Sequence, residues 1–396
     1  MKRRLAIVTT HPIQYNAPLF KCLGERGIIE IMVFYTWGEA VQQDKYDPGF
    51  GVNVNWDVPV LQGYNYRFPE NTAKRKGSDH FLGIDNPGIV EEIDAWKPDA
   101  LLVYGWNFKS HLKLMVHYKG RIPVLFRGDS TCLDDRGIGW VRVRMFGLRA
   151  IYHYIDIAFY AGTDNKAYFK KACVNDLKLV AAPHAVDNSF FEDPDGAYER
   201  RASEWRMQLG IEENAVVFLF AGKLEKKKSP SLLLDVFRSG GFPERSHLVF
   251  AGSGKLESSL RSGAGDERVH FIGFQNQSAM PVTYRIGDVF ILPSGGPGET
   301  WGLAINEAMA CGRPAIASDK CGGTADLIIN GVNGYSFESG NAEDLKNKML
   351  LFTQDRPGMR QMGGAALAQV QNFSLTRQAE AIEQTVLKTG RGALQK

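Results

Sequence analysis

Residues 294–312 read SGGPGETWGLAINEAMACG, and this stretch decides how the fold is interpreted. The run 289–293, VFILP, comes before it and is typical of a buried strand that ends at its proline. Residues 294–298 include glycines and a proline, so they are expected to form a loop. From Trp301 onward the pattern suits a helix that ends at Gly312. A strand, a glycine loop and a helix in this order form the unit with which open α/β sheets bind anionic ligands.

Two acids, Glu299 and Glu307, straddle the start of the expected helix. Eight residues of helix rise about 12 Å. A glycosidase needs its two carboxyls within roughly 5 to 10 Å of each other, so this pair is expected to lie too far apart to flank one bond. The pair suits the two ends of one elongated ligand, with a diphosphate at the helix N-terminus between them. The alternative is one glutamate that caps the helix and another on its surface.

The stretch resembles the E-x7-E signature of the retaining family-4 glycosyltransferases (glycosyl transferases group 1), which have the GT-B fold. This resemblance implies an α/β protein with two doubly wound, Rossmann-like domains that face each other across a cleft. It also implies that Glu299 is a catalytic residue that contacts the transferred sugar, and that Glu307 holds the ribose hydroxyls of a nucleotide. The neighbouring positions that it assigns to donor binding are Gly298, Trp301, Gly302 and Leu303.

Predicted strands alternate with helical or loop segments in both halves of the chain, which favours parallel sheets. We expect an acceptor-side domain at 1–195, a nucleotide-sugar-binding domain at 196–374, and at 375–396 a helix that crosses back to the first domain, followed by a tail. The expected strands are 5–9, 29–34, 100–103, 124–126, 157–160 and 177–181 in the first half, and 215–221, 247–251, 269–272, 288–292 and 314–317 in the second.

The segment FLFAGKLEKKKS at 218–229 predicts a phosphate site, because basic side chains at the carboxyl end of a strand are placed to clamp a diphosphate. The segment resembles the family pattern G-R-L-x-x-x-K-G at Gly222, at Lys223 (in the place of arginine) and at Lys228. Lysine keeps the charge but lacks the two-pronged contact of arginine. Lys226 and Lys227 match no family position and are expected to be solvated.

Two other segments of the second half complete the expected donor site. The sequence 269–274, VHFIGF, resembles the family segment whose following loop touches the base, so Phe274 and Gln275 are candidate base contacts. Core packing is an equally good account of Phe274. The sequence AGSGK at 251–255 lacks the third glycine of a dinucleotide fingerprint and indicates only a turn near the nucleotide.

The first half offers candidate acceptor-side residues in the loops after its strands. His11, Gln14 and Tyr15 stand in THPIQY at 10–15, where many relatives have a glycine-rich loop. Their side chains offer hydrogen bonds to an acceptor, and a simple capping turn is the alternative.

Two more loops of the first half depart from the family pattern. The sequence FRGDS at 126–130 stands where many relatives carry a histidine close to the reacting sugar. Asp129 is a second catalytic candidate that can accept a sugar hydroxyl, or it merely pairs with Arg127, an acceptor-side candidate. His184 in APHAVD at 182–187 stands where the family motif P-N-G-V-D has asparagine. It is expected near the acceptor side of the cleft, with a structural role as the alternative.

The composition narrows the class of protein. A chain of 396 residues with 44% hydrophobic residues has room for about two or three domains. Its five cysteines are scattered, so no disulfide framework or zinc site is expected and a reducing cytoplasm fits. The net charge is +3 and the positive excess lies in the first half, which suits an acidic acceptor or peripheral contact with the inner face of an anionic membrane. Ordinary surface charge is the alternative, and no nucleic acid is expected as a partner.

These features predict a retaining glycosyltransferase that moves a sugar from a nucleotide sugar to a glycan, lipid-linked or small-molecule acceptor, in polysaccharide or glycoconjugate synthesis. Lysines and helix amides would carry the charge of the leaving diphosphate, and no D-x-D motif stands at the site, so no metal or other cofactor is expected. Two alternatives are a GT-B epimerase that acts on the nucleotide sugar and a non-catalytic binder of carbohydrate or an anionic polymer.

Overall fold

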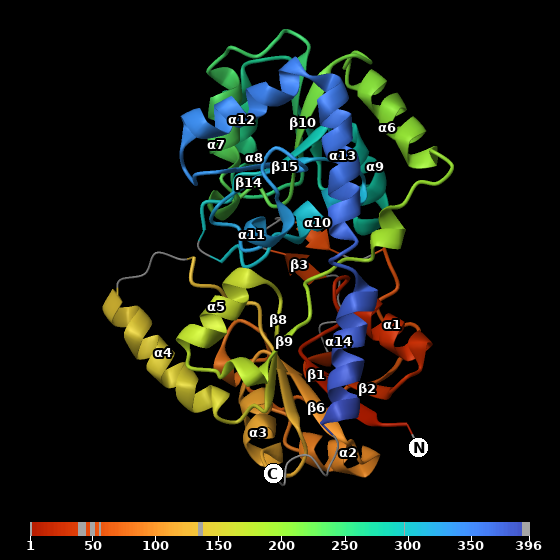
Figure 1. The fold of residues 1–396 in the computed structure, drawn as a ribbon, viewed down its shortest axis with the longest axis vertical. Coiled ribbons are helices and arrows are strands. Elements are labelled where there is room, and N and C mark those ends of the chain that lie inside the picture. Colours follow the sequence, from red (N-terminus) through yellow and green to blue (C-terminus); the bar gives the residue numbers. More distant parts are fainter. Residues whose placement is uncertain are drawn as a thin grey trace.

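A computed structural model describes residues 2–38, 45–47, 52–54, 57–133, 138–296 and 298–389. For residues 45–47, 52–54, 138–140 and 142 it describes the backbone only. Two parallel sheets, each with helices on both faces, lie one above the other in Figure 1. This arrangement confirms the predicted α/β class with two doubly wound, Rossmann-like domains.

The first sheet has seven strands in the order β5-β2-β1-β6-β7-β8-β9. Its strands are β1 (Arg4–Thr9), β2 (Glu30–Tyr35), β5 (Asn65–Arg67), β6 (Ala100–Tyr104), β7 (Val124–Arg127), β8 (Ile157–Tyr160) and β9 (Leu179–Ala181). The chain adds strands on one side of β1 and then on the other, so the order reverses between β1 and β6. The loop after β1 therefore begins at the switch point of this sheet.

The second sheet has six strands in the order β12-β11-β10-β13-β14-β15. They are β10 (Val216–Ala221), β11 (Ser246–Ala251), β12 (Val269–Gly273), β13 (Val289–Leu292), β14 (Ala315–Ser318) and β15 (Gly334–Phe337). Its order reverses between β10 and β13, so the loops after these two strands start side by side. A separate antiparallel pair joins β3 (Lys45–Asp47) to β4 (Val52–Val54).

Alternate residues of the central strands face opposite sides, so each sheet has two hydrophobic cores. In β1, Leu5 and Ile7 pack under one layer of helices, and Ala6 and Val8 pack under the other. The helices of the first domain are α1 (Ala17–Arg26), α2 (Ile89–Trp96), α3 (Lys109–Tyr118), α4 (Ile138–Tyr152) and α5 (Thr163–Lys171). Those that cover the second sheet are α6 (Ala197–Gln208), α7 (Pro230–Arg238), α8 (Glu257–Ala264), α9 (Met280–Ile286), α10 (Leu303–Ala310), α11 (Thr324–Leu327), α12 (Ala342–Gln354) and α13 (Arg356–Val370).

The last helix, α14 (Leu375–Lys388), follows α13 but packs on the first domain (Figure 1). Its buried residues Ala379, Ile382 and Val386 join the core beneath α1. The side chain of Arg26 on α1 donates to both carboxylate oxygens of Glu383, at 3.0 to 3.1 Å. The chain therefore crosses from one sheet to the other and back again.

Candidate functional site

The ends of strands from both sheets meet around a cavity of about 520 Å³. The first domain contributes the segments that follow β1, β7 and β9, and the second domain contributes mainly those that follow β10, β12 and β13. Because β1 and β10 both stand at a reversal of strand order, the cavity occupies the position where open α/β sheets bind ligands. Its volume falls within the usual range for small-molecule sites.

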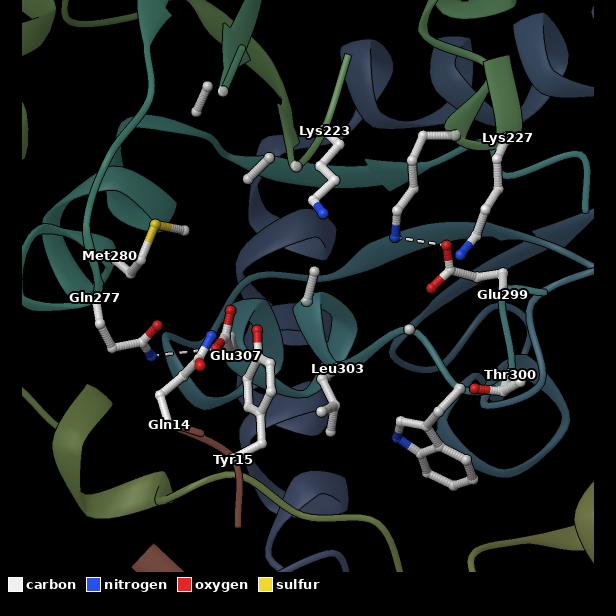
Figure 2. A pocket seen from close by; sticks show the side chains of 18 of the residues that line it. Gln14, Tyr15, Lys223, Lys227, Gln277, Met280, Glu299, Thr300, Leu303 and Glu307 are labelled. Carbon is white, nitrogen blue, oxygen red and sulfur yellow. Dashed lines mark hydrogen bonds and ion pairs between the residues drawn. The ribbon is translucent and has the colours of Figure 1, made fainter. Parts of the chain in front are cut away.

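The start of α10 lies in the middle of this cavity. Figure 2 shows Glu299 and Glu307 on opposite sides of Leu303, the first residue of the helix. The helix does not start at Trp301 as predicted, because Gly302 has a left-handed φ of 89°. A Cβ atom there would lie 2.5 Å from the Cys321 Sγ, so only glycine fits. The unpaired N–H groups of the first helical turn and the helix dipole favour an anionic group here.

Glu299 lies in the loop after β13 and is 8% exposed. Its Oε2 accepts a hydrogen bond from the Ser294 hydroxyl at 3.1 Å and lies 2.5 Å from the Lys228 Nζ. The structure therefore places the predicted catalytic carboxylate at the cavity wall, paired with a lysine that the sequence also assigned to the site.

Lysines of the segment after β10 gather at the Glu299 end of the cavity. Lys223, Lys227 and Lys228 all line the cavity. In Figure 2 Lys227 is directed toward Glu299, and Lys223 points into the middle of the cavity above Leu303. Lys227 was expected to be solvated, and its position in the cavity wall contradicts that expectation. The residues Lys226–Lys228 form a 3-10 turn, in which successive side chains point in different directions, so Lys227 reaches the cavity and Lys226 does not line it.

Glu307 closes the opposite end of the cavity and is 3% exposed. Its carboxylate accepts hydrogen bonds from the Tyr284 hydroxyl at 2.6 Å and from the Gln277 Nε2 at 3.3 Å. Burial raises the pKa of Glu307 to about 7, although these two hydrogen bonds oppose the rise. Gln14 and Tyr15 approach this end from the first domain (Figure 2). A buried carboxylate among neutral hydrogen-bonding groups suits a ligand that carries hydroxyls.

Asp129 and His184 line the cavity from the first domain. The Thr300 hydroxyl donates to the Asp129 Oδ2 at 2.9 Å, which joins this carboxylate to the loop that carries Glu299. The His184 ring lies against Trp301, with ring centroids 5.8 Å apart. Burial, together with the nearby Arg127 guanidinium, lowers the pKa of His184 to about 4. His184 is therefore a neutral wall of the cavity near neutral pH.

Two predicted acceptor-side residues do not line the cavity. His11 hydrogen-bonds the Thr10 hydroxyl at 3.0 Å, and its ring packs edge-on to Trp37. Arg127 is 5% exposed and donates from Nη1 to the Ala182 carbonyl at 2.7 Å, so it holds the segment that leads to His184. In the structure His11 therefore packs beside Trp37, and Arg127 braces the segment before His184, so a contact of either side chain with an acceptor stays a prediction.

The remaining predicted donor-side residues, Gly222, Phe274, Gln275, Gly298 and Trp301, all line the cavity. The backbone of the AGSGK segment passes close to the backbone at Gly222. A Cβ atom on Gly252 would lie 2.0 Å from the Gly222 carbonyl oxygen. Glycine at position 252 therefore lets the chain after β11 approach the chain after β10.

Sequence reasoning missed several residues of the wall. Thr300 stands next to Glu299 in the chain, and that adjacency is a signal that could have identified it. Gln277 and Tyr284 lie on a short turn and on α9, where neither a strand end nor a motif marks them. The lining residues that the sequence did not assign are Ile13, Ala221, Glu225, Lys227, Ala251, Gly252, Gln277, Met280, Tyr284, Thr300 and Ala304.

The sequence of the second domain matches a known family. The family model described as glycosyl transferases group 1 matches residues 202–369, which include both glutamates and the lysines of the cavity. Residues 202–369 are a glycosyl transferases group 1 domain.

Known glycosyltransferases are also similar to this chain in sequence. The sulfoquinovosyl transferase SQD2 of Arabidopsis thaliana is 30% identical over 306 residues, which cover 73% of this chain and 56% of that protein. A D-inositol 3-phosphate glycosyltransferase of Rhodococcus erythropolis is 28% identical over 195 residues, 46% of this chain and 43% of that protein. The chain thus spans about half the length of the curated relatives that it matches.

Solved structures share the fold of nearly the whole chain. Anabaena Alr3699/HepE, in complex with UDP and glucose, superposes with a TM-score of 0.70 at 17% identity, covering 98% of this chain and 100% of that one. A sucrose-phosphate synthase from Thermosynechococcus elongatus superposes with a TM-score of 0.71 at 18% identity, over 98% and 99% of the two chains. These likenesses confirm the two-domain fold.

None of the helices in the described residues combines the length and apolar character of a membrane span. Over the same part of the chain, no group of three or more His, Cys, Asp or Glu side chains is arranged to hold a metal ion.

Proposed function

We propose that this protein is a retaining glycosyltransferase that moves a sugar from a nucleoside-diphosphate sugar to a hydroxyl of an acceptor. The observation that carries the proposal is the layout of the cavity: Glu299 and Glu307 lie at opposite ends, with the start of α10 between them. The group 1 match of the second domain supports the reaction class. A role in cell-surface polysaccharide or glycoconjugate synthesis, in the cytoplasm or at the inner membrane face, is part of the proposal.

Each end of the cavity receives one part of the donor. Glu307 accepts the ribose hydroxyls, and Phe274 and Gln275 lie near the base. The diphosphate lies against the first amides of α10, where Lys223, Lys227 and Lys228 offset its charge. Glu299 contacts the transferred sugar, and Asp129 contacts a sugar or acceptor hydroxyl from the other domain.

The proposed step exchanges two bonds at one carbon. The bond from the sugar C1 to the diphosphate oxygen breaks, and its electron pair stays on the leaving diphosphate. The acceptor oxygen bonds to C1 on the same face, and its proton passes to the leaving diphosphate. Glu299 then stabilises or positions the sugar and need not act as a nucleophile.

A UDP sugar is the first donor to test. The structural neighbour Alr3699/HepE was crystallised with UDP and glucose and also with UDP-glucose. A panel of UDP, GDP and ADP sugars, screened by thermal shift, identifies the donor because a ligand at 100 times its Kd stabilises the folded protein by about 2.7 kcal/mol.

The release of free nucleotide from the selected donor tests the proposal. A transferase, which also hydrolyses its donor slowly, releases nucleoside diphosphate, and the anomeric configuration of the product, followed by NMR, matches that of the donor. Epimerisation of the sugar without release of nucleotide would replace the proposal by a GT-B epimerase. Binding without any change of the donor would leave a carbohydrate-binding protein.

We propose further that the reaction needs no metal, because lysines and helix amides stand where a cation would offset the diphosphate. Turnover with the selected donor is expected to persist in a chelator. A loss of activity that magnesium or manganese restores would overturn the metal-free step.

A further inference from the structure

The helix α4 combines a buried face and an exposed apolar face. Leu148 and Tyr152 are buried in the core of the first domain. On the outside, Val143 and Phe146 are 75% and 79% exposed, and Ala150 is also exposed. Spacings of three and four residues place these three side chains on one stripe of the helix. Exposed apolar residues that occur singly are ordinary, whereas neighbouring ones that form a patch indicate an interaction surface.

Positive charge lies along both edges of this stripe. The sequence of α4, IGWVRVRMFGLRAIY, has three arginines and no acid. Arg149 is exposed near Phe146. Arg144 lies toward the other edge, where its guanidinium stands 5.6 Å from the ring centroid of Tyr168 on α5. Helix α5 itself carries Lys166, Lys170 and Lys171 with one acid, Asp164, and Lys170 pairs with Asp176 at 3.0 Å.

We propose that the stripe Val143–Phe146–Ala150 and its arginines form a docking surface for an anionic lipid bilayer. An apolar face edged by arginines is the pattern of helices that lie in the membrane interface, where apolar side chains enter the acyl boundary and basic ones meet anionic headgroups. Figure 1 places α4 along the outer flank of the first domain, and it is the first helix after β7, whose following loop carries Asp129 to the cavity. A bilayer beneath α4 would therefore lie beside the domain to which we assign the acceptor.

A second copy of the chain fits this surface less well. Stable interfaces use roughly 20 to 30 residues from each partner, whereas the stripe is one helix face with three apolar side chains. Its arginines would also meet their own counterparts across a symmetric contact, because a two-fold interface brings the same patches together.

Vesicle cosedimentation tests the proposal with the full chain and without any donor. We expect vesicles of phosphatidylcholine with phosphatidylglycerol to bind the protein much more tightly than vesicles of phosphatidylcholine alone, with binding weakened by salt. The double variant Val143→Glu/Phe146→Glu should lower the partition coefficient at least about tenfold, and Arg149→Ala about fivefold, since each basic residue near the surface contributes about a factor of five. The control is Met207→Glu on α6, which changes an equally apolar side chain that is 69% exposed and should leave binding unchanged.

The proposal is overturned if the wild type binds neither kind of vesicle, or if the double variant binds as the wild type does. It is also overturned if sedimentation velocity detects a wild-type dimer that is absent in the double variant, because the stripe then contacts a second copy of the chain. All the substituted side chains are exposed, so an unchanged Tm is the check on folding. The surface does not rest on the proposed reaction: release of nucleotide is measured without vesicles, so either result can fail alone.

Discussion

The two glutamates of the cavity differ in what surrounds their carboxylates. Glu299 faces the Lys228 ammonium and the Ser294 hydroxyl, whereas Glu307 is held by a tyrosine and a glutamine. In the proposed reaction Glu299, beside a cation, contacts the transferred sugar, and Glu307, among neutral groups, holds the ribose hydroxyls. We therefore expect substitution of Glu299 to affect turnover and substitution of Glu307 to affect binding.

Glu299→Gln tests the first of these roles. The amide keeps the size of the side chain and removes its charge, so kcat should fall roughly a hundredfold, the scale of one lost electrostatic contact. The Kd for the nucleoside diphosphate, measured by calorimetry, should change little because the transferred sugar is absent from that ligand. Unchanged turnover would remove Glu299 from the reaction.

Glu307 predicts how stability depends on pH. Its pKa of about 7 in the folded protein lies above the ordinary 4.5, because the carboxylate is buried. Below pH 4.5 the group is protonated in both states and has no effect. Between pH 4.5 and 7 the unfolded chain loses this proton first, so the free energy of unfolding falls, by about 3 kcal/mol in all. Above pH 7 the loss is constant.

Glu307→Gln should remove this fall, because the amide cannot ionise. Denaturant titrations across that pH range, on both proteins, measure the difference. Parallel pH profiles for the variant and the wild type would mean that the carboxyl is not buried in this way. The variant should also bind nucleoside diphosphate and nucleoside more weakly, since both carry the ribose.

The lysines of the 3-10 turn offer a matched pair of variants. Lys227→Ala removes a cavity side chain, and Lys226→Ala removes its neighbour outside the wall. Hydrogen bonds to charged groups contribute about 1.5 to 3 kcal/mol, so Lys227→Ala should weaken nucleoside diphosphate binding at least about tenfold, and Lys226→Ala should not. Neither should alter nucleoside binding. Calorimetry measures the Kd for the nucleoside diphosphate. Equal changes of this Kd in the two variants would mean that Lys227 does not contact the diphosphate.

At the scale of elements, α10 has its position because one glycine turns the chain into it. Gly302→Ala would place a methyl group 2.5 Å from the Cys321 Sγ and 2.8 Å from the Leu292 Cδ2, at a left-handed φ of 89°. We expect a loss of about 2 kcal/mol or more in the free energy of unfolding, from strain and overpacking. The helix start should shift, so nucleoside diphosphate binding should fall as well.

The control for this variant is Gly364→Ala inside α13, where a Cβ atom would meet nothing within 4 Å. That change should be neutral or stabilise the protein by up to about 1 kcal/mol, since alanine favours helix. Denaturant unfolding compares the two. A Gly302→Ala protein as stable as wild type would show that the turn tolerates a side chain.

The elements that the sequence predicted are those with a strong local signal. Buried strands such as β1 and β10 are continuous apolar runs, and their predicted bounds differ from the observed ones by a residue or so. The strands β5 (NYR) and β15 (GYSF) were missed, because short edge strands with exposed or polar residues carry little pattern. Residues 177 and 178 were predicted as strand but belong to the 3-10 turn Asp176–Lys178, which the Asn175 side chain caps.

The site was predictable to the extent that its residues follow strands or match motifs. Glu299, Glu307 and Lys228 satisfy both conditions and lie at the cavity. Tyr284 reaches Glu307 only through the packing of α9 beside α10, and that packing has no signature in the local sequence. The supporting positions of His11 and Arg127 likewise depend on tertiary contacts.

At the scale of the whole molecule, polar contacts join the two domains around the cavity. The Asp326 carboxylate accepts from the Thr163 backbone N–H and hydroxyl at 2.8 and 2.7 Å, and Asp129 accepts from Thr300. These contacts lie near the surface or at the cavity, where water competes with them. The return helix α14 adds a buried connection, because its apolar face and Glu383 pack on α1.

Arg26→Met tests that connection. Glu383 is 2% exposed, so the variant leaves a buried carboxylate without its guanidinium, which should lower the free energy of unfolding by about 3 kcal/mol. The comparison is Arg261→Met, which breaks the exposed pair with Glu257 on α8 and should cost about 0.5 kcal/mol or less. Adding Glu383→Leu to Arg26→Met should restore most of the lost free energy of unfolding, because no charge then remains buried at this site. Denaturant unfolding measures all three, and a loss in Arg26→Met no larger than in Arg261→Met would show that the apolar face of α14 alone holds it to the first domain.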